Sequence, residues 1–327
     1  MEAPLRAALA SGKPVVSANK VLLAEKLDEL GVLAQRTATP LSCEAAVTSA
    51  IPILRHLSHR ADEVESLLAI VNGTSNYLIT RLEQDGLTLE AARMGLAEAD
   101  PSADLDGSDA VAKLSILCYR AFGAWFAPKD LPARGIRDLQ AADCRLAASL
   151  GFRIRHIARA QRQGAVLDVG VEPVLLPSWH LLASVEEEYN AVYMQCTNSG
   201  DLSLFGKGAG GLPAATAVLT DLIDLAQDNS MRWPEPRRIA TADPGQRTRR
   251  HYLRVRAERR GDAVEQIKGL LGPWNLIAET VSSDADGTRM HYGFLLSASS
   301  DESFDNARSE VAKQPWVADC LGLGVIE

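Results

Sequence analysis

The stretch GKPVVSANKVLLAE, from Gly12 to Glu25, reads as a short strand followed closely by a helix. The apolar run at 14–17 predicts a buried strand, a polar turn follows at 18–20, and residues 21–30 are predicted to be helical. Residues 3–10 read as the end of another helix, which stops at Gly12. Strands that feed helices through short polar turns are typical of α/β proteins with a mostly parallel sheet. The chain therefore starts inside an α/β unit.

The middle of the chain changes character. The region up to residue 123 mixes strands, expected at 41–47 and 67–72, with helices at 76–84 and after Ser108. From Arg153 onward strands dominate, and a helix closes this part; we expect the strands at 153–161, 166–176, 190–198 and 201–206 and the helix at 213–226. This pattern predicts an α+β domain with a mixed sheet.

Residues 229–249 carry Pro, Gly and charge without apolar periodicity, and we interpret them as a linker. The remaining segment, 250–327, contains in order a strand, a helix, two strands, a helix and a strand. That βαββαβ order is typical of a ferredoxin-like unit.

Composition limits the classes of function. With 327 residues, 46% of them hydrophobic, the chain is long enough for two or three domains. A net charge of -8 without a basic run argues against nucleic acid, and no segment is apolar enough to be a signal peptide or to span a membrane. The five cysteines are scattered and never spaced CxxC, which fits a reducing compartment. We expect a cytoplasmic protein without nucleic-acid or membrane partners.

The segment GLAEADPSADLDGSDAVAKLSIL, residues 95–117, holds five acidic residues and one lysine, Lys113. A calcium site is one interpretation, because Asp104-Leu105-Asp106-Gly107 copies the middle of an EF-hand loop. It fails because the closing carboxylate position would be Lys113. A second interpretation is a solvated loop with a surface pair of Asp109 and Lys113 at i,i+4. A third is a catalytic centre, in which carboxylates position the lysine as a proton donor. Spacing alone leaves the last two open.

Five blocks resemble the signature blocks of homoserine dehydrogenases, in that family's order, and cover nearly all of residues 1–228. They are GKPVVSANKVLLAE (12–25), CEAAVTSAIPILRHL (43–57), IVNGTSNYLITRLEQDG (70–86), the acidic segment, and FGKGAGGLPAATAVLTDLID (205–224). The terminal unit is similar to ACT regulatory domains. The resemblance implies four parts: a partial Rossmann-type NAD(P)-binding domain at 1–40, completed by about 205–228; an α+β catalytic and dimerisation domain at 41–204; the linker at 229–249; and a ferredoxin-like, ACT-like domain at 250–327.

Homoserine dehydrogenases interconvert L-aspartate 4-semialdehyde and L-homoserine with NAD(P), in threonine, methionine and isoleucine biosynthesis. The resemblance therefore implies an oxidoreductase that forms a homodimer. Carried over by motif, the implied catalytic residues are Lys113 as proton donor, Lys20 and Asp109. The implied substrate-binding residues are Glu98, Asp109, Asp104 and Thr74, and the implied cofactor-binding residues are Lys20, Gly95 and Gly210. The family also binds a monovalent cation such as sodium, here through backbone around Glu44, Val47, Ser49 and Ile51.

Departures from the family pattern leave questions open. The strand, GxGxxG turn and helix that bind the cofactor pyrophosphate do not precede Gly12, so we expect an incomplete NAD(P)-binding half. Truncation, a separate chain and real loss all remain as explanations. The alternative function is a catalytically silent or partner-dependent binding or regulatory protein that lacks this half. The preference between NAD and NADP stays undetermined.

Residues 206–211 form a literal GxGxxG, but no second strand with an acidic residue follows about 20 positions on. We interpret them as the family's C-terminal glycine motif. Leu96 replaces a usual aromatic residue, and 48–50 read Thr-Ser-Ala where glycines are usual, so the exact substrate stays open. Residues 259–261 read Arg-Arg-Gly in place of the usual acidic residue and Pro-Gly, so effector binding by the ACT-like unit also stays open.

Overall fold

The computed structural model describes residues 2–58, 62–94, 100–272, 274–284 and 287–327. Its helices are α1 (Glu2–Ala10), α2 (Lys20–Arg36), α3 (Ile53–Ser58), α4 (Gly73–Gln84), α5 (Leu89–Arg93), α6 (Ser102–Asp106), α7 (Ser108–Phe122), α8 (Ala141–Ser149), α9 (Gly211–Ala226), α10 (Ala263–Leu271) and α11 (Asp301–Ala312). Its strands are β1 (Val15–Val16), β2 (Leu41–Ser42), β3 (Val64–Ile70), β4 (Phe152–Gln163), β5 (Val166–Pro177), β6 (Tyr189–Cys196), β7 (Gly200–Lys207), β8 (Ala240–Thr241), β9 (Thr248–Glu258), β10 (Leu276–Ser283), β11 (Arg289–Ser300) and β12 (Val317–Val325). Among these described helices, none is long and apolar enough to cross a membrane.

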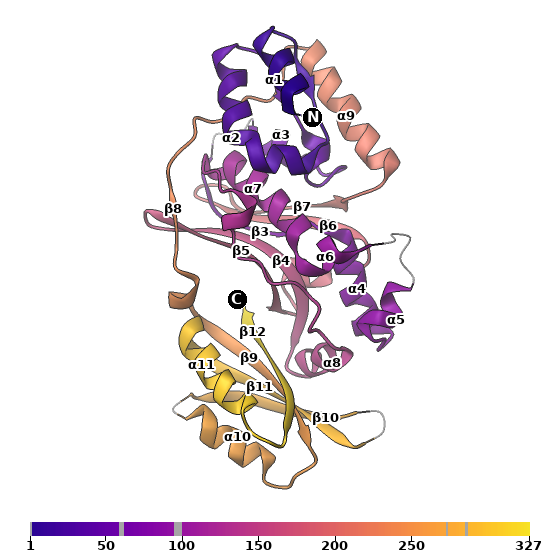
Figure 1. Ribbon diagram of the computed structural model, residues 1–327, viewed down its shortest axis with the longest axis vertical. Helices are drawn as coiled ribbons and strands as arrows, with labels where there is room; N and C mark the ends of the chain where they lie inside the picture. The colour runs from indigo at the N-terminus through magenta and orange to yellow at the C-terminus, as the bar shows by residue number, and fades with distance from the viewer. Residues whose placement is uncertain (1, 59–61, 95–99, 273, 285–286) are drawn as a thin grey trace.

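The N-terminal part contains a two-stranded parallel sheet, β1 and β2, with helices α1, α2, α3 and α9 near it at one end of the molecule (Figure 1). The predicted strand and helix of the opening stretch are present as β1 and α2. The side chain of Asn19 caps α2 by accepting a hydrogen bond from the backbone N–H of Leu22 at 3.2 Å. The fold therefore begins with the α/β unit that the sequence predicts.

The strand predicted at 41–47 is wrong beyond Ser42. Residues Glu44–Ala46 form a 3₁₀-helix instead. The cause is the buried carboxylate of Glu44, which accepts hydrogen bonds from the backbone N–H groups of Leu54 and Arg55 at 2.8 and 2.7 Å. These bonds cap the start of α3 and fold the chain back on itself.

The main sheet is mixed and runs in the order β10-β11-β9-β12-β5-β4-β3-β6-β7, with β8 pairing alongside β5. The long hairpin of β4 and β5 forms its centre, and helices α4, α7 and α8 pack against β4. The coarse prediction of a mixed α/β architecture is confirmed. This architecture places α7 between the N-terminal helices and the central strands (Figure 1).

The C-terminal strands and helices follow in the predicted order, β9, α10, β10, β11, α11 and β12 (Figure 1). Within the sheet these strands lie in the order β10-β11-β9-β12 and pair antiparallel, and they enclose an apolar core that includes Leu253, Ile267 and Phe294. The last residues of β12 also pair parallel with β5, through Gly324 and Val174. The C-terminal unit therefore continues the central sheet.

The predicted linker has little regular structure but is packed against the protein. Trp233 is buried and stacks on Tyr119 of α7, with ring centroids 5.6 Å apart. Its indole N–H donates to the carbonyl of Leu41 at 2.9 Å. These contacts join the N-terminal part, α7 and the connecting segment into one core.

Candidate active site

Helix α7 runs through the interior, and its residues from Asp109 to Arg120 are all buried. Asp109 and Lys113 expose only 7% and 8% of their surfaces. Their charged groups meet one helical turn apart, with Lys113 Nζ 2.9 Å from Asp109 Oδ2. The interpretation of this pair as a solvated surface pair is therefore wrong. A buried ion pair needs further partners to offset the cost of desolvation.

Lys20, the first residue of α2, supplies a second ammonium group. Its Nζ forms an ion pair with Oδ1 of Asp109, so the two carboxylate oxygens hold one lysine each. Lys113 Nζ also donates a hydrogen bond to the backbone carbonyl of Val71 at 2.7 Å. The side chain of Lys20 is 42% exposed, whereas that of Lys113 is 10% exposed. The ammonium group of Lys20 is therefore open to solvent, and that of Lys113 is enclosed.

Asn72 joins the acidic residues to α4, and the sequence analysis missed it. Its side-chain nitrogen donates to Asp109 Oδ2 at 2.7 Å and to Asp104 Oδ1 at 2.5 Å. Its side-chain oxygen caps α4 by accepting from the backbone N–H of Ser75 at 2.7 Å. An asparagine directly before a helical run is an N-cap signal, which locates Asn72 but not its carboxylate partners.

These contacts shift the acidity of both members of the pair. Burial raises the pKa of Asp109, but the positive charges of Lys113 and Lys20 outweigh it and bring that pKa down to about 2. Burial lowers the pKa of Lys113 from its ordinary value of 10.5, and the charge of Asp109 opposes this effect. Asp109 is thus a fixed negative charge, and Lys113 is an ammonium group that releases its proton more easily than a free lysine.

A buried histidine, also missed, lies behind the start of α4. His156 of β4 has Nδ1 3.2 Å from the Ser75 hydroxyl and Nε2 3.0 Å from the carbonyl of Arg134. Burial lowers its pKa to about 4, so the ring is neutral and Nε2–H donates to that carbonyl. A Cβ at Gly107, the residue before α7, would lie 3.4 Å from this ring. His156 therefore packs beneath the starts of both α4 and α7.

The remaining predicted acids separate into different environments. Asp104 is half-buried and accepts a hydrogen bond from Asn72. Asp106 is exposed and ion-paired with Arg137. Asp100 accepts hydrogen bonds from the backbone N–H and hydroxyl of Ser102 at 3.0 and 2.6 Å. The described acidic residues of this segment therefore do not form one cluster.

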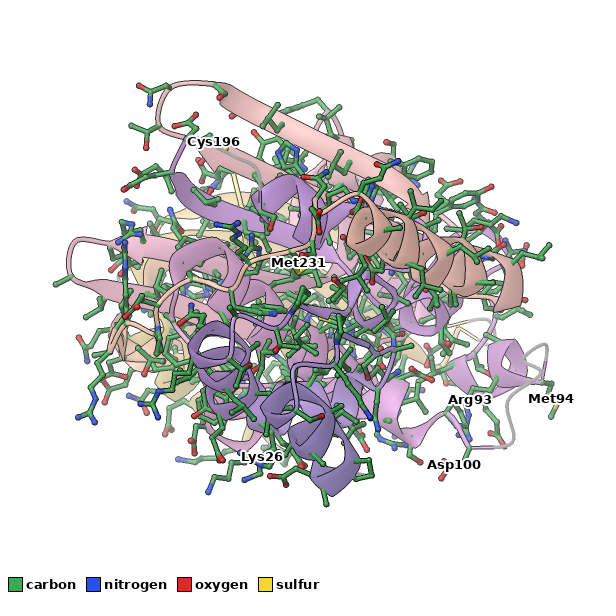
Figure 2. All side chains as sticks on the ribbon, turned by 90° about the horizontal axis from the view of Figure 1, so that it is seen from above. Lys26, Arg93, Met94, Asp100, Cys196 and Met231 are labelled. Carbon is green, nitrogen blue, oxygen red and sulfur yellow. The ribbon has the colours of Figure 1, made fainter. Side chains whose placement is uncertain are left out.

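The predicted residues Gly95 and Glu98, and the departure at Leu96, lie outside the described residues. Met94 and Asp100, which flank them, lie at the edge of the molecule (Figure 2). Thr74 lies in the first turn of α4, two residues after Asn72, and is half-buried. The structure thus brings together Lys20, Asp109, Lys113 and Asp104.

Comparison with known proteins identifies the family. A family model described as homoserine dehydrogenase matches residues 51–223, more than half of the chain. The homoserine dehydrogenase of Neisseria gonorrhoeae is 35% identical over 301 residues, which cover 86% of this chain and 68% of that protein. The chain belongs to the homoserine dehydrogenase family.

Other homoserine dehydrogenases are also similar to this chain. The enzyme of Corynebacterium glutamicum is 34% identical over 295 residues, covering 85% of this chain and 66% of that protein, so the chain spans slightly less than two thirds of its length. A solved homoserine dehydrogenase from Thiobacillus denitrificans superposes with a TM-score of 0.88 at 29% identity, over 100% of this chain and 79% of that one. A hyperthermophilic archaeal homoserine dehydrogenase in complex with NADPH gives a TM-score of 0.60 at 29% identity, over 71% of this chain and 69% of that one.

In this homoserine dehydrogenase family member the glycine motif joins β7 to α9. Gly210 has a φ of +114° and precedes α9 without a side-chain cap. A Cβ on Gly208 would lie 1.9 Å from the side-chain nitrogen of the buried Asn190. Only glycine fits these two positions, because Asn190 packs directly against the backbone of Gly208 and Gly210 has a positive φ.

The glycine motif also differs from a pyrophosphate-binding turn. Strand β7 pairs antiparallel with β6 and is the last strand of the sheet path, whereas a dinucleotide turn follows a strand within a parallel βαβ unit. After α9 the chain continues into the extended segment that contains Trp233. The topology supports the interpretation of this motif as something other than the missing pyrophosphate turn.

The predicted cation loop, residues 44–51, is tightly folded. Ser49 has a φ of +42°, a left-handed conformation that is uncommon for a residue with a side chain. The Ile51 carbonyl accepts hydrogen bonds from the Ile53 N–H at 2.8 Å and the Thr48 hydroxyl at 3.2 Å. Asp221 of α9 accepts from the backbone N–H of Glu44 at 3.0 Å. The loop is therefore fixed against α9.

Proposed function

We propose that this chain catalyses the NAD(P)-dependent interconversion of L-aspartate 4-semialdehyde and L-homoserine, the reaction of homoserine dehydrogenases. The observation that carries the proposal is the Asp109 carboxylate, which holds Lys20 and Lys113 at one place on two different helices. Two ammonium groups at one site suit a reaction in which negative charge develops on a carbonyl oxygen. The family membership of the chain supports the same choice.

In this reaction Lys113 protonates the carbonyl oxygen. Its ammonium group is oriented by Asp109 and by the Val71 carbonyl, which leaves its remaining N–H for the substrate. Burial lowers its pKa and so makes it a better proton donor than an exposed lysine. Lys20, on the more open side of Asp109, stabilises the developing negative charge.

The acidic residues of the site favour a substrate that carries an ammonium group. Asp104 accepts one hydrogen bond from Asn72 and is half-buried, so its second oxygen is the available acceptor. We propose that Asp104, Asp109, Glu98 and Thr74 bind the amino-acid end of the substrate. Thr74, Asp104 and Asp109 lie on α4, α6 and α7, and the proton donor Lys113 lies one turn after Asp109 on α7.

We propose a nicotinamide cofactor, NAD or NADP, bound beside this site. The archaeal relative described above is in complex with NADPH, and Gly210 is exposed and has no side chain to hinder a flat ring. When bound, the cofactor supplies or accepts hydride. The residues of this chain proposed to contact it are Lys20, Gly95 and Gly210.

We further propose a homodimer in the cytoplasm, acting in threonine, methionine and isoleucine biosynthesis. All five cysteines are free thiols, which fits a reducing compartment. The domain division proposed from the sequence, with an ACT-like C-terminal unit, fits the βαββαβ element order. Backbone carbonyls around Glu44, Val47, Ser49 and Ile51 are proposed to bind a monovalent cation such as sodium, for which the Ile51 carbonyl would have to give up hydrogen bonds from Thr48 and Ile53.

The reaction is tested by incubating the purified chain with aspartate 4-semialdehyde and millimolar NADPH. The expected result is loss of NADPH absorbance that matches the homoserine formed, mole for mole, by mass spectrometry. The matched control is a Lys129→Ala variant, which changes an exposed lysine in a short 3₁₀-helix and should behave as the wild type. Absence of homoserine with folded wild-type protein would support the silent binding protein instead.

A further inference from the structure

A cavity lies where the C-terminal unit meets the central sheet, at a different place from the Lys113 site. Its volume is about 200 Å³. Strand β5 and the segment 132–134 form one side, and β9, α11 and β12 form the other. This volume corresponds to roughly seven water molecules at about 30 Å³ each, which is the size of a small organic molecule.

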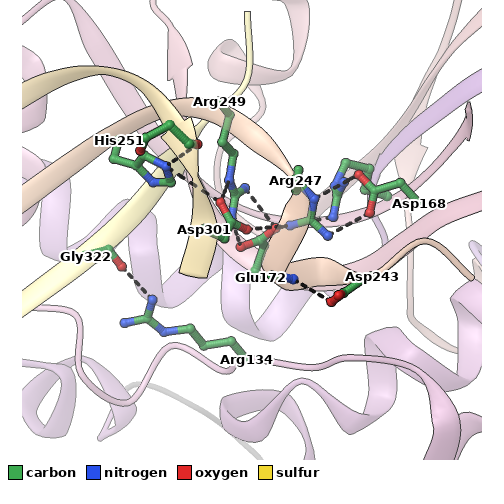
Figure 3. Close-up of polar contacts among 12 residues, drawn as sticks. Arg134, Asp168, Glu172, Asp243, Arg247, Arg249, His251, Asp301 and Gly322 are labelled. Atoms are coloured by element: carbon green, nitrogen blue, oxygen red, sulfur yellow. Dashed lines mark hydrogen bonds and ion pairs between the residues drawn. The ribbon is translucent and has the colours of Figure 1, made fainter. Parts of the chain in front are cut away.

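Most charges in the wall of this cavity neutralise one another. Glu172 accepts hydrogen bonds from Arg247 at 2.9 Å and from Arg249 at 3.0 and 2.9 Å, and Asp301 lies 2.8 Å from Arg249. Asp168 in turn pairs with Arg159 and with Arg247 (Figure 3). Three arginines thus face three carboxylates, and the side chains of all six are at most 16% exposed.

Arg134 also lines the cavity and is separate from this network (Figure 3). Its Nη1 donates to the backbone carbonyl of Gly322 at 2.5 Å. No ion pair links it to any carboxylate among residues 2–58, 62–94, 100–272, 274–284 and 287–327. The nearby Asp305 already pairs with Arg308, at 3.1 Å. Arg134 is an exposed residue; partial burial of its guanidinium lowers its pKa, and the nearby carboxylates of Asp138, Glu172 and Asp305 oppose this effect without forming an ion pair with it.

The wall that Arg134 faces is rigid backbone. A Cβ on Gly322 would lie 2.3 Å from the ring of Phe304, and one on Gly324 would lie 2.0 Å from the guanidinium of Arg249. Phe304 and Arg249 therefore pack directly against the main chain of β12. A fixed wall beside a guanidinium that forms no ion pair within the described part of the chain is suited to selective binding.

We propose that this cavity binds a small organic monocarboxylate, with its carboxylate held by Arg134. A guanidinium presents parallel N–H donors that match the two oxygens of a carboxylate. Arg134 uses one nitrogen for Gly322, which leaves its other donors for the ligand. Glu172, Asp301 and Asp305 are each already paired with an arginine, so Arg134 is the guanidinium of the wall that is left for an anion, and one such group matches one carboxylate.

The test is isothermal titration calorimetry with propionate, at ionic strength held constant with sodium chloride. Propionamide, of the same shape without the charge, is the matched ligand control. Wild type is compared with Arg134→Gln, with Arg134→Lys, and with Arg137→Gln, which removes an exposed arginine only three residues away. Because binding is measured as heat without turnover, the outcome is independent of the proposed reaction.

We expect saturable binding of propionate to wild type and to Arg137→Gln, with a Kd of about 1 mM or tighter, and none of propionamide. Arg134→Gln should weaken binding at least tenfold, and Arg134→Lys should lie between. Circular dichroism checks folding, and if Arg134→Gln unfolds, Arg134→Lys and the propionamide comparison still decide. Equal binding by the Arg134 variants, equal binding of propionamide, or tighter binding of inorganic phosphate would overturn the proposal.

Discussion

Lys113 and Asp109 form a buried ion pair one turn apart on α7, with 2.9 Å between Nζ and Oδ2. The same carboxylate holds Lys20 from α2 through its other oxygen. Because Asp109 bridges two helices that are far apart in sequence, any change to it alters both ammonium groups together. This relationship makes the acidity of Lys113 sensitive to each of its neighbours.

The acidity of Lys113 predicts a pH dependence. Aldehyde reduction needs the protonated ammonium group, so its rate should fall as the pH rises through a pKa that burial places below 10.5. Homoserine oxidation needs the free amine, so its rate should rise through the same pKa. Rates in both directions, measured across alkaline pH, check this. Parallel profiles for the two directions would contradict the assignment.

Two substitutions should move this profile in opposite directions. Asp109→Asn removes the negative charge that raises the pKa of Lys113, so the midpoint should shift to lower pH. Lys20→Ala removes a positive charge that lowers it, so the midpoint should shift to higher pH. Each shift is read from kcat for reduction against pH. A shared direction would show that Lys113 is not the titrating group.

Lys20→Ala should also reduce kcat/KM for the aldehyde by roughly 10²- to 10³-fold, because it removes one stabilising charge at the carbonyl oxygen. Lys26→Ala, on the same helix, is the control, since Lys26 is partly exposed (Figure 2) and pairs with Glu29. Steady-state kinetics of the two variants compare them directly. Similar losses in both would indicate damage to α2 rather than to the site.

Asn72→Ala should destabilise the protein by about 1–2 kcal/mol, because it removes the cap of α4 and a donor to two carboxylates. Asn72→Ser restores a capping oxygen but not the amide donor. It should recover part of the stability, measured by urea unfolding, but its kcat should remain below that of the wild type. A wild-type kcat in Asn72→Ser would mean that Asn72 only caps α4 and that its amide donor does not matter for the reaction.

Ser49→Gly should stabilise the protein by up to about 1 kcal/mol. Ser49 has a φ of +42°, and a left-handed backbone costs a residue with a side chain more than it costs glycine. Ser309→Gly, in the interior of α11, should instead destabilise by about 0.5–1 kcal/mol. Unfolding in urea measures both. A loss of stability in Ser49→Gly would mean that the side chain stabilises the loop.

Much of the site could be predicted from sequence because its parts are local. The i,i+4 spacing of Asp109 and Lys113 implies that they share a helix face, and the motif at Asn19 and Lys20 signals a helix start. Burial decided between the two interpretations of that pair. Burial depends on what packs against α7, including Trp233 from more than a hundred residues later, and no local pattern encodes it.

The missed residues share one physical property. Asn72 binds carboxylates 32 and 37 positions away, and His156 binds Ser75 across 81 positions. The 3₁₀-helix at Glu44–Ala46 likewise depends on a carboxylate that folds back onto Leu54 and Arg55. In each case the partner is set by tertiary contact, whereas propensity and periodicity describe only neighbours along the chain.

The most direct test of the account is kcat for aldehyde reduction in Lys113→Ala, compared with Lys26→Ala in the same preparation conditions. Removal of the proton donor should lower kcat by roughly 10²- to 10⁴-fold while the fold, checked by circular dichroism, is kept. Lys26→Ala should match wild type. Wild-type kcat in Lys113→Ala would contradict the central claim that this lysine, held by Asp109, protonates the carbonyl oxygen.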